Sequence, residues 1–273
     1  MLPILFTIGP IKIYTFGVFL VLGFFWSLFI LWKNIRLTSY KEEEVFDGVF
    51  LSIFFGLFFS RLFYVILNFN KFGFDFLKFI LINGYPGLSL YGFLFGFFVY
   101  LWLFLRLRKI KFLEMVDYLI PSFFIILIFG KLGAFFSGSE VGIRTSFFLK
   151  TKYLGFEEYR HLTAFYESIF FIIGALVSQK ILFEIRKEKF SKGFLFYFFI
   201  WHFSLVCFLF DKIKDNKLYF FGFSFDYLIS LILLLTTTSF FVYYFRSNIL
   251  SFINNYGQKI VKKIYSRTKR KTS

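Results

Sequence analysis

The sequence predicts an all-α integral membrane protein with about seven transmembrane helices. Of its 273 residues, 58% are hydrophobic and 27% are aromatic, fractions well above those of a soluble domain. Mean hydropathy is +0.71. Long apolar runs alternate with short polar segments along the chain, and several runs reach the roughly 20 residues that a helix needs to cross a bilayer.

Seven apolar runs meet this length requirement, each bounded by charged residues or by segments that contain Gly or Asn. They cover residues 13–32, 45–68, 88–105, 117–136, 161–183, 193–210 and 223–245. The first run does not resemble a cleavable signal peptide, because it lacks a preceding basic stretch and a following small-residue cleavage site. We therefore expect a seven-helix membrane domain over 1–245 and a basic cytoplasmic tail over 246–273. The external segments 69–87 and 137–160 are predicted to form a small arm and a small cap.

The distribution of basic residues predicts the orientation of the helices. With an external N-terminus, 19 Lys and Arg residues fall in the inner loops and the C-terminal tail, against 10 in the outer segments. Because inner loops carry the excess of Lys and Arg, the N-terminus is predicted outside and the C-terminus inside. The net charge of +16 is then mostly a topology signal and an attraction to anionic lipid headgroups, so no nucleic-acid partner is expected.

Cysteine and histidine are too scarce for a disulfide framework or a metal cluster. Cys207 is the single cysteine of the sequence, which excludes an internal disulfide and a Cys-based metal site. The two histidines, His161 and His202, form a cluster only if carboxylates join them. We therefore expect neither a metal site nor a cofactor.

Arg61 is a charged residue that the sequence places at membrane depth. It lies in the second run, in "SRLFYVIL", where an unpaired guanidinium costs at least about 2.5 kcal/mol. Arg61 must therefore find a partner in the bundle or extend to the outer interface, and its position alone does not choose between these. Tyr64 follows three residues later, on the same helical face.

Two further segments bring charges to the ends of predicted helices. In "GKLGAFFSGSEVGIRT", Lys131 and Glu140 flank a glycine-rich stretch that forms either a helix packing seam or a helix end lining a cavity. In "HLTAFYES", His161 is either an interface anchor or a site residue, and Tyr166 and Glu167 follow it. A buried Glu167 is costly unless it is paired, so these residues indicate packing or a site with equal weight.

The order of the motifs resembles one family, the bacterial prolipoprotein diacylglyceryl transferases. The likeness covers nearly the whole chain. "IGPIKIYTFG" resembles the family's opening IGP followed by Tyr-Gly, and "SRLFYVIL" is similar to its G-A-R-L-x-Y-V. The later motifs G-x-S-x-H-G-G-L-x-G, G-R-x-G-N-F-x-N-G-E-x-x-G and H-P-x-Q-L-Y-E correspond to "GLSLYGFLFG", "GKLGAFFSGSEVG" and "HLTAFYE".

The chain departs from the family pattern at several polar positions. Tyr91 stands where the family has a catalytic His, and Lys131 stands where it has Arg. The family's sixth-span pattern R-F-x-x-E-x-x-R falls on "HFSLVCFL", which places His202 at the first of its charged positions. Other departures are Phe93, Ala134, Ser137, Leu162, Ala164, Val206 and Leu209.

The resemblance implies transfer of the diacylglyceryl group of phosphatidylglycerol to the lipobox cysteine thiol of a prolipoprotein, with release of glycerol phosphate. The implied partners are phosphatidylglycerol, prolipoprotein signal peptides and membrane lipids. The implied location is the bacterial cytoplasmic (inner) membrane, as a multi-pass protein and a monomer. Because the polar site departs from the family, a catalytically degenerate paralogue that binds lipids or lipoprotein signals stays open. A transporter is disfavoured because the chain has no inverted repeat.

The implied reaction needs a base to form the thiolate and cations to hold the phosphate. The predicted catalytic residues are Tyr91 and His202. Tyr91 is a weak base unless a cation such as Arg61 lowers its pKa. The predicted substrate-binding residues are Arg61, Tyr64, Lys131, Ser137, Glu140, His161, Tyr166 and Glu167.

Overall fold

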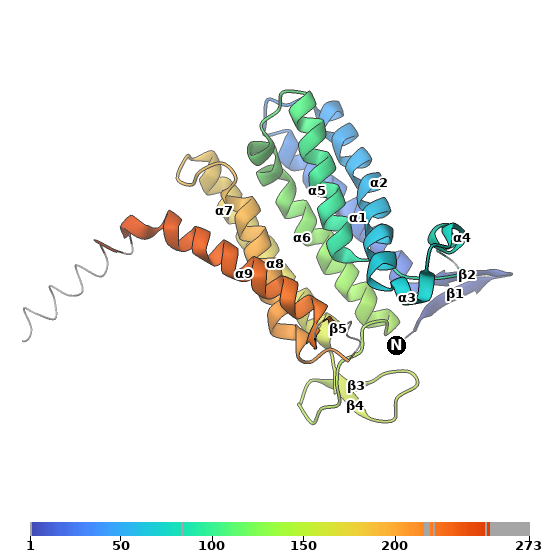
Figure 1. The fold of residues 1–273 in the computed structure, drawn as a ribbon. Helices are drawn as coiled ribbons and strands as arrows, with labels where there is room; N and C mark the ends of the chain where they lie inside the picture. Colours follow the sequence, from blue (N-terminus) through green and yellow to red (C-terminus); the bar gives the residue numbers. More distant parts are fainter. Residues whose placement is uncertain (1, 83, 216–218, 221, 249, 252–273) are drawn as a thin grey trace, which may run out of the picture.

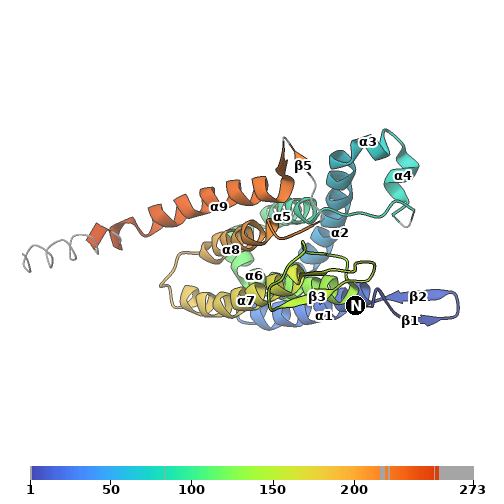
Figure 2. The ribbon, with the colours of Figure 1, turned by 90° about the horizontal axis from the view of Figure 1, so that it is seen from below.

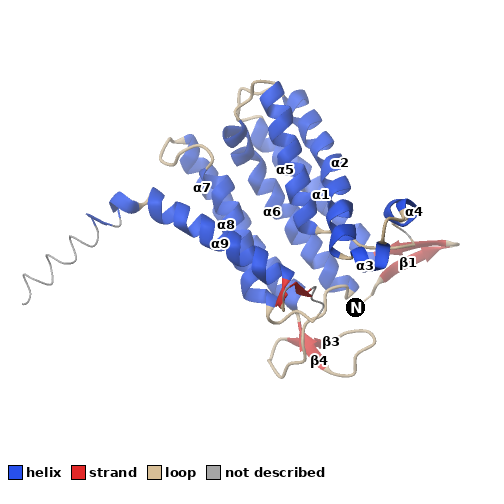
Figure 3. Ribbon diagram, in the orientation of Figure 1, coloured by secondary structure: helices blue, strands red, loops and turns tan. Residues whose placement is uncertain are grey.

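The computed structural model describes residues 2–82, 84–215, 219–220, 222–248 and 250–251. The described chain is mainly helical, with three short antiparallel strand pairs (Figure 3). Most of the predicted basic tail lies outside the described residues.

Among the described residues, seven helices are long and apolar enough to cross a membrane, which confirms the predicted fold class. They are α1 (Thr15–Ile35), α2 (Glu42–Leu67), α5 (Leu90–Leu107), α6 (Phe112–Ser137), α7 (Thr163–Arg186), α8 (Phe194–Asp211) and α9 (Phe225–Tyr244). The predicted runs find each helix, but their limits shift. The first helix begins two residues late because residues 11–14 form a strand, and α6 begins five residues early, at Phe112.

Helix α6 is the centre of the bundle (Figure 1). It packs against α1, α7 and α8, while α2 packs against α5, and α8 also contacts α9. Large side chains such as Phe97, Phe124 and Phe199 are fully buried between these helices. Many other phenylalanines are exposed, as expected for side chains that face lipid.

The short elements gather near the end of the bundle where the N-terminus lies (Figures 1 and 2). They comprise the hairpin β1 (Ile4–Ile8) and β2 (Ile11–Tyr14), the arm helices α3 (Phe69–Phe72) and α4 (Phe76–Ile80), the cap strands β3 (Lys150–Lys152) and β4 (Tyr159–His161), and the pair β5 (Tyr219–Phe220) and β6 (Phe223–Ser224). The predicted arm and cap segments thus lie near one end of the bundle, together with the connection between α8 and α9.

Backbone hydrogen bonds join the cap to the connection between α8 and α9. The amide of Ile143 donates to the carbonyl oxygen of Ile213 at 2.9 Å, and the amide of Asp215 donates to that of Val141 at 3.0 Å. Arg160 of β4 pairs with Asp215 at 2.6 Å. The cap therefore fixes the position of the connection that leads into α9.

At the opposite end of the bundle, a buried carboxylate fixes the start of α8. Asp117 of α6 accepts hydrogen bonds from the backbone amides of Gly193, Leu195 and Phe196, at 2.6 to 3.2 Å. These amides have no partner within the first turn of a helix, so the carboxylate takes the place of a capping side chain. Asp117 thereby sets the position of α8, whose far end reaches the pocket described below.

The orientation of the bundle is testable with reporter fusions. We expect a fusion at Lys189, between α7 and α8, to report an inner location and a fusion at Lys214, between α8 and α9, to report an outer one. The reason is the asymmetry of 19 inner against 10 outer basic residues. A phosphatase fused to the C-terminus and active outside the cell would contradict this orientation.

Candidate active site

A pocket of about 250 Å³ lies where the ends of α2, α5, α6, α7, α8 and α9 converge. We call it the charged pocket. Its polar lining residues are Tyr64, Ser89, Tyr91, Lys131, Glu140, Cys207, Lys214 and Asp226. The rest of its wall is apolar, with Phe171, Phe203 and Phe225 among the lining residues. A pocket that combines an apolar wall with a few convergent charges is suited to bind an amphipathic molecule.

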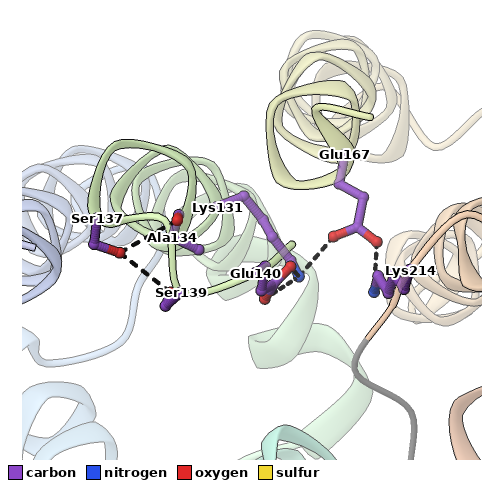
Figure 4. A network of polar contacts seen from close by, with 7 residues as sticks. All are labelled: Lys131, Ala134, Ser137, Ser139, Glu140, Glu167 and Lys214. Carbon is purple, nitrogen blue, oxygen red and sulfur yellow. Dashed lines mark hydrogen bonds and ion pairs between the residues drawn. The ribbon is translucent and has the colours of Figure 1, made fainter. Parts of the chain in front are cut away.

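Three of these lining residues join a chain of alternating charge, in the order Glu140, Lys131, Glu167 and Lys214 (Figure 4). The Lys131 ammonium lies 2.7 and 2.8 Å from the two carboxylate oxygens of Glu140. It also lies 2.6 Å from Oε2 of Glu167, whose Oε1 is 2.6 Å from the Lys214 ammonium. The Glu167 side chain is fully buried, so it depends on both lysines to offset its desolvation.

Local backbone structure explains how Glu140 reaches Lys131. Lys131 lies near the end of α6, which terminates at Gly138 in the left-handed conformation, with φ of 73°. Glycine adopts this conformation without the steric penalty of a side chain, so the chain can reverse direction there. The reversal brings Glu140 back to the Lys131 side chain. The glycine-rich stretch therefore combines the two alternatives: Gly133 permits close packing of α6 on α1, and the helix end at Gly138 leads to a pocket.

Neighbouring charges determine the ionisation of Glu140 and Lys214, which lie outside the membrane-spanning helices. Burial opposes ionisation of Glu140, but Lys131 and Lys214 outweigh it and hold the pKa of this carboxyl below its ordinary value. Burial likewise opposes the charge of Lys214, but Glu167 and Glu140 outweigh it and raise the pKa of the ammonium. Both groups are therefore charged at neutral pH.

These shifts predict a broad pH range in which the charged pocket is stable. The contribution of Glu140 is present above its ordinary pKa of 4.5 and is lost as the pH falls through the lower value of the folded state. The contribution of Lys214 is fully present below 10.5 and is lost only as the pH rises through its raised value. Both contributions therefore persist between about pH 5 and 10.

We expect the difference in thermal unfolding midpoint between the wild type and Glu140→Gln to be constant over this range. Below about pH 4.5 the difference should shrink, because protonated Glu140 resembles Gln in both states. Unfolding measured in detergent across this pH range checks the prediction. A difference that grows on acidification would contradict it.

Tyr91 enters the pocket from the first turn of α5. The Ser89 hydroxyl accepts a hydrogen bond from the amide of Gly92 and so caps this helix. A side chain at Gly92 would lie 2.6 Å from the carbonyl oxygen of Phe59, so glycine permits the close approach of α5 to α2. The Tyr91 ring contacts Phe203 and Phe225 edge-on, with ring centres 6.1 and 5.9 Å away.

The Tyr91 hydroxyl is buried and has no hydrogen-bond partner among the described residues. Cys207 lies beside it, but a thiol is only a weak hydrogen-bonding group. A buried hydroxyl without a partner is destabilising by about 1–3 kcal/mol, and such groups are uncommon outside functional sites. The hydroxyl is therefore available to a molecule in the pocket.

Arg61 lies in α2, and its side chain contacts the arm instead of lining the charged pocket. This buried guanidinium donates to the carbonyl oxygens of Lys78, Phe79, Tyr85 and Gly87, at 2.7 to 2.9 Å. Arg61 therefore meets its need for partners by fixing the arm against α2. Of the two predicted substrate-binding residues Arg61 and Lys131, Lys131 lines the charged pocket, whereas the carbonyl groups of the arm bind the Arg61 guanidinium.

Two predicted residues lie away from the charged pocket for other reasons. His202 packs between α7 and α8, where its Nε2 is 2.9 Å from the carbonyl oxygen of Phe170 and its ring faces Gly174. The Ser137 hydroxyl donates to the carbonyl oxygen of Ala134 at 3.2 Å and lies at the end of α6. Neither side chain lines the charged pocket.

His161 and Tyr166 line a different, apolar pocket of about 340 Å³ near the cap. Burial lowers the pKa of His161, which is therefore mainly neutral at pH 7. Its carbonyl oxygen accepts a hydrogen bond from the Tyr153 hydroxyl, whose pKa burial raises to about 12. The Tyr166 hydroxyl donates to the carbonyl oxygen of Leu149, so both residues hold the cap onto α7.

Lys214 and Asp226 are site residues that the sequence analysis missed. Both line the charged pocket, Lys214 from the connection after α8 and Asp226 from the first turn of α9. A signal was present for Asp226, because a lone carboxylate within a predicted transmembrane run marks a functional position. No comparable signal marked Lys214, which the sequence places in an external loop beside other lysines.

The fold and the pocket define the class of this protein: a multi-pass membrane protein with a charged pocket where its helix ends converge. The chain belongs to the prolipoprotein diacylglyceryl transferase family, whose model matches residues 3–243. This match confirms the resemblance that the motifs indicated.

Relatives with a curated name show the same relationship at low identity. The chain is 26% identical over 224 residues to the phosphatidylglycerol–prolipoprotein diacylglyceryl transferase of Clostridium novyi (strain NT), covering 79% of this chain and 85% of the relative. A protein of the same name from Lysinibacillus sphaericus (strain C3-41) is 26% identical over 235 residues, covering 81% and 83%. Another, from Clostridium perfringens (strain 13 / Type A) and named transferase 1, is 26% identical over 239 residues, covering 84% and 89%.

Proposed function

We propose that this protein transfers the diacylglyceryl group of phosphatidylglycerol to the lipobox cysteine of a prolipoprotein in the bacterial inner membrane. The observation that carries the proposal is the charged pocket itself. It places two lysines at the ends of membrane helices, in a chain that the family model matches over residues 3–243. An anionic headgroup can reach these lysines while its acyl chains stay in lipid.

The four-charge chain prepares the pocket for an anion. Glu140 and Glu167 hold Lys131 in place, and Glu167 also holds Lys214. The ammonium groups are therefore charged and oriented before a phosphate arrives, which limits the reorganisation that accompanies the reaction. Tyr64 shares the pocket lining and can contact the glycerol part of the headgroup.

We assign Tyr91 the role of a hydrogen-bond donor to the phosphate. A role as base requires a cation that lowers its pKa, but the Arg61 guanidinium is bonded to the arm. The buried hydroxyl can instead donate to an oxygen on which negative charge develops. His202 then acts in helix packing, and Arg61 acts by fixing the arm beside the pocket.

A binding protein without transferase activity is the second candidate. It is favoured by the Tyr91 position, where a tyrosine without a polar partner stands in place of the family's catalytic His. In this case the pocket still holds an anionic lipid, but no thioether forms.

Complementation separates the two functions. We expect the chain to restore incorporation of labelled lipid into a model prolipoprotein in a bacterial strain depleted of its own transferase. The control is the same prolipoprotein with its lipobox cysteine replaced by serine, which should stay unlabelled. Absence of labelling by a chain that is folded and inserted in the membrane would favour the binding protein.

A further inference from the structure

The connection between α8 and α9 brings a cation and a carboxylate to the charged pocket. We propose that Lys214 binds the phosphate of the lipid and that Asp226 accepts the proton of the attacking thiol. This inference rests on the proposed transferase function and assigns to two named residues the tasks that it requires.

Of the two lysines that line the charged pocket, Lys214 has donors that are still free to bind a phosphate. An ammonium group has three donors. Around Lys131, three carboxylate oxygens lie within 2.8 Å, two from Glu140 and one from Glu167. Among the described residues, Lys214 has one such oxygen, Oε1 of Glu167. Lys214 can therefore bind a phosphate without losing its existing partner, whereas Lys131 must release a carboxylate first.

Compared with Glu140 and Glu167, Asp226 is the carboxylate whose oxygens are free to accept a proton. Glu140 pairs with Lys131, and Glu167 pairs with both lysines. Within the described part of the chain, Asp226 forms neither an ion pair nor a hydrogen bond, although it lines the same pocket. A carboxylate bound to an ammonium is a poor proton acceptor, because the cation favours the ionised form. Asp226 is thus the carboxylate best suited to accept a proton from a substrate.

Neighbouring contacts hold Asp226 in the pocket. The Ser224 hydroxyl donates to a carboxylate oxygen of Asp211 at 2.6 Å, which ties the start of α9 to the end of α8. Phe225 lies edge-on to Tyr91, with ring centres 5.9 Å apart. The carboxylate is therefore held on a helix terminus that lines the same pocket as Tyr91, whose hydroxyl we assign to the phosphate.

The step balances with these groups alone. Asp226 takes the proton of the substrate thiol as the sulfur attacks the glyceryl carbon that carries the phosphate ester. A carbon–sulfur bond forms and the carbon–oxygen bond to phosphate breaks. The electron pair of the broken bond stays on the phosphate oxygen, which Lys214 and Tyr91 stabilise. The proton on Asp226 then passes to the released glycerol phosphate, which regenerates the carboxylate.

Steady-state kinetics in membranes test both assignments, with phosphatidylglycerol and a lipobox peptide as substrates. We expect Asp226→Asn to lower kcat about 100-fold or more, as for the loss of a general base, with little change in the KM for phosphatidylglycerol. Asp226→Glu keeps the charge but moves it, and should retain intermediate activity. We expect Lys214→Gln to raise the KM for phosphatidylglycerol about tenfold or more, as for the loss of a charge-assisted hydrogen bond.

Two matched controls carry the same chemical changes at exposed positions outside the pocket. Asp47→Asn is the control for Asp226→Asn, and Asp47 lies in the early part of α2. Lys212→Gln is the control for Lys214→Gln, and Lys212 lies two residues before Lys214 on the same connection. Both should keep wild-type kinetics.

Each outcome decides between the alternatives. An Asp226→Asn protein with more than half of the wild-type kcat overturns the base, and an unchanged KM in Lys214→Gln overturns the phosphate contact. If Asp226→Asn does not fold, Asp226→Glu decides, and full activity in that variant overturns the assignment. A folded wild type that transfers nothing overturns the proposed function and this inference together. An active wild type whose Asp226 and Lys214 variants keep wild-type kinetics overturns this inference alone, so the two failures are distinguishable.

Discussion

Glu167→Gln is expected to lower the free energy of unfolding by about 3–5 kcal/mol, the range for breaking a buried ion pair. Glu167 is fully buried and is the carboxylate that Lys131 and Lys214 share. Gln cannot carry the negative charge, so the Lys214 ammonium loses its ion-pair partner in a largely buried setting. Thermal unfolding of the detergent-solubilised protein measures the loss, and transfer of the diacylglyceryl group should fall with it.

A matched substitution isolates the effect of burial. Glu158 pairs with Arg144 at 2.7 Å, close to the distances around Glu167, but these side chains are 45% and 75% exposed. Exposed pairs contribute about 0–1 kcal/mol, so Glu158→Gln should change the unfolding midpoint little. Equal losses from the two substitutions would show that burial of the charge chain is not what stabilises the fold.

The double variant Glu167→Gln with Lys214→Gln separates stability from function. Removing the stranded ammonium should recover part of the lost stability, because the uncompensated charge dominates the loss. Transfer should stay low, because the pocket then lacks the cation assigned to the phosphate. A double variant that regains transfer would remove Lys214 from the mechanism.

The fold follows from the sequence because a bilayer imposes a simple length rule. Each helix must keep about 20 apolar residues in lipid, so hydropathy alone identifies the seven spans found among the described residues. The exact helix limits do not follow, because hydrogen bonds outside the apolar core determine them. The first span starts at Thr15, after β2 pairs with β1, and α6 begins at Phe112, five residues before the predicted run.

The site follows from the sequence only where local charges reveal it. The sequence places Lys131 and Glu140 nine residues apart on either side of a glycine-rich stretch, and the structure pairs their charges. Glu167 was expected to need a partner, but one of its two partners is Lys214, 47 residues later in the chain. That pairing depends on the way the cap holds the connection between α8 and α9, which no sequence spacing encodes.

Arg61 shows a second limit of sequence reasoning. The cost of a guanidinium at membrane depth predicted a partner, and buried hydrogen bonds supply one. Its partners are backbone carbonyl oxygens of the arm, a kind of partner that no pattern of side chains reveals. A conspicuous buried charge therefore serves the structure here, while the inconspicuous Asp226 and Lys214 line the pocket.

Under the proposed function, the same arrangement lets the pocket differ from the family pattern and still bind an anion. The sixth-span departures leave apolar residues at Val206 and Leu209, and His202 is used in packing. Lys214 lies just past the end of the same helix and restores a cation to the pocket. In this proposal the cation lies at a helix terminus instead of within a span, where a charged side chain is less costly to hold in a membrane.

Tyr91→Phe is expected to lower the rate of transfer about 100-fold while leaving the fold as stable as the wild type or more stable by about 1 kcal/mol. The two effects have one cause. The Tyr91 hydroxyl is buried and has no hydrogen-bond partner among the described residues, so its removal relieves a desolvated polar group. The same hydroxyl is the donor that we assign to the phosphate, so its removal weakens stabilisation of the leaving group.

Tyr100→Phe is the matched control for this prediction. Tyr100 lies on the same helix and stacks on Phe55 at 4.0 Å, away from the charged pocket. Its substitution should leave the rate of transfer unchanged. Stability is read from thermal unfolding in detergent, and transfer is read from lipid labelling of the model prolipoprotein. A Tyr91→Phe protein with the wild-type rate would leave Tyr91 as a packing residue. A variant that is slower in transfer but more stable to unfolding would identify a hydroxyl that serves function and lowers stability.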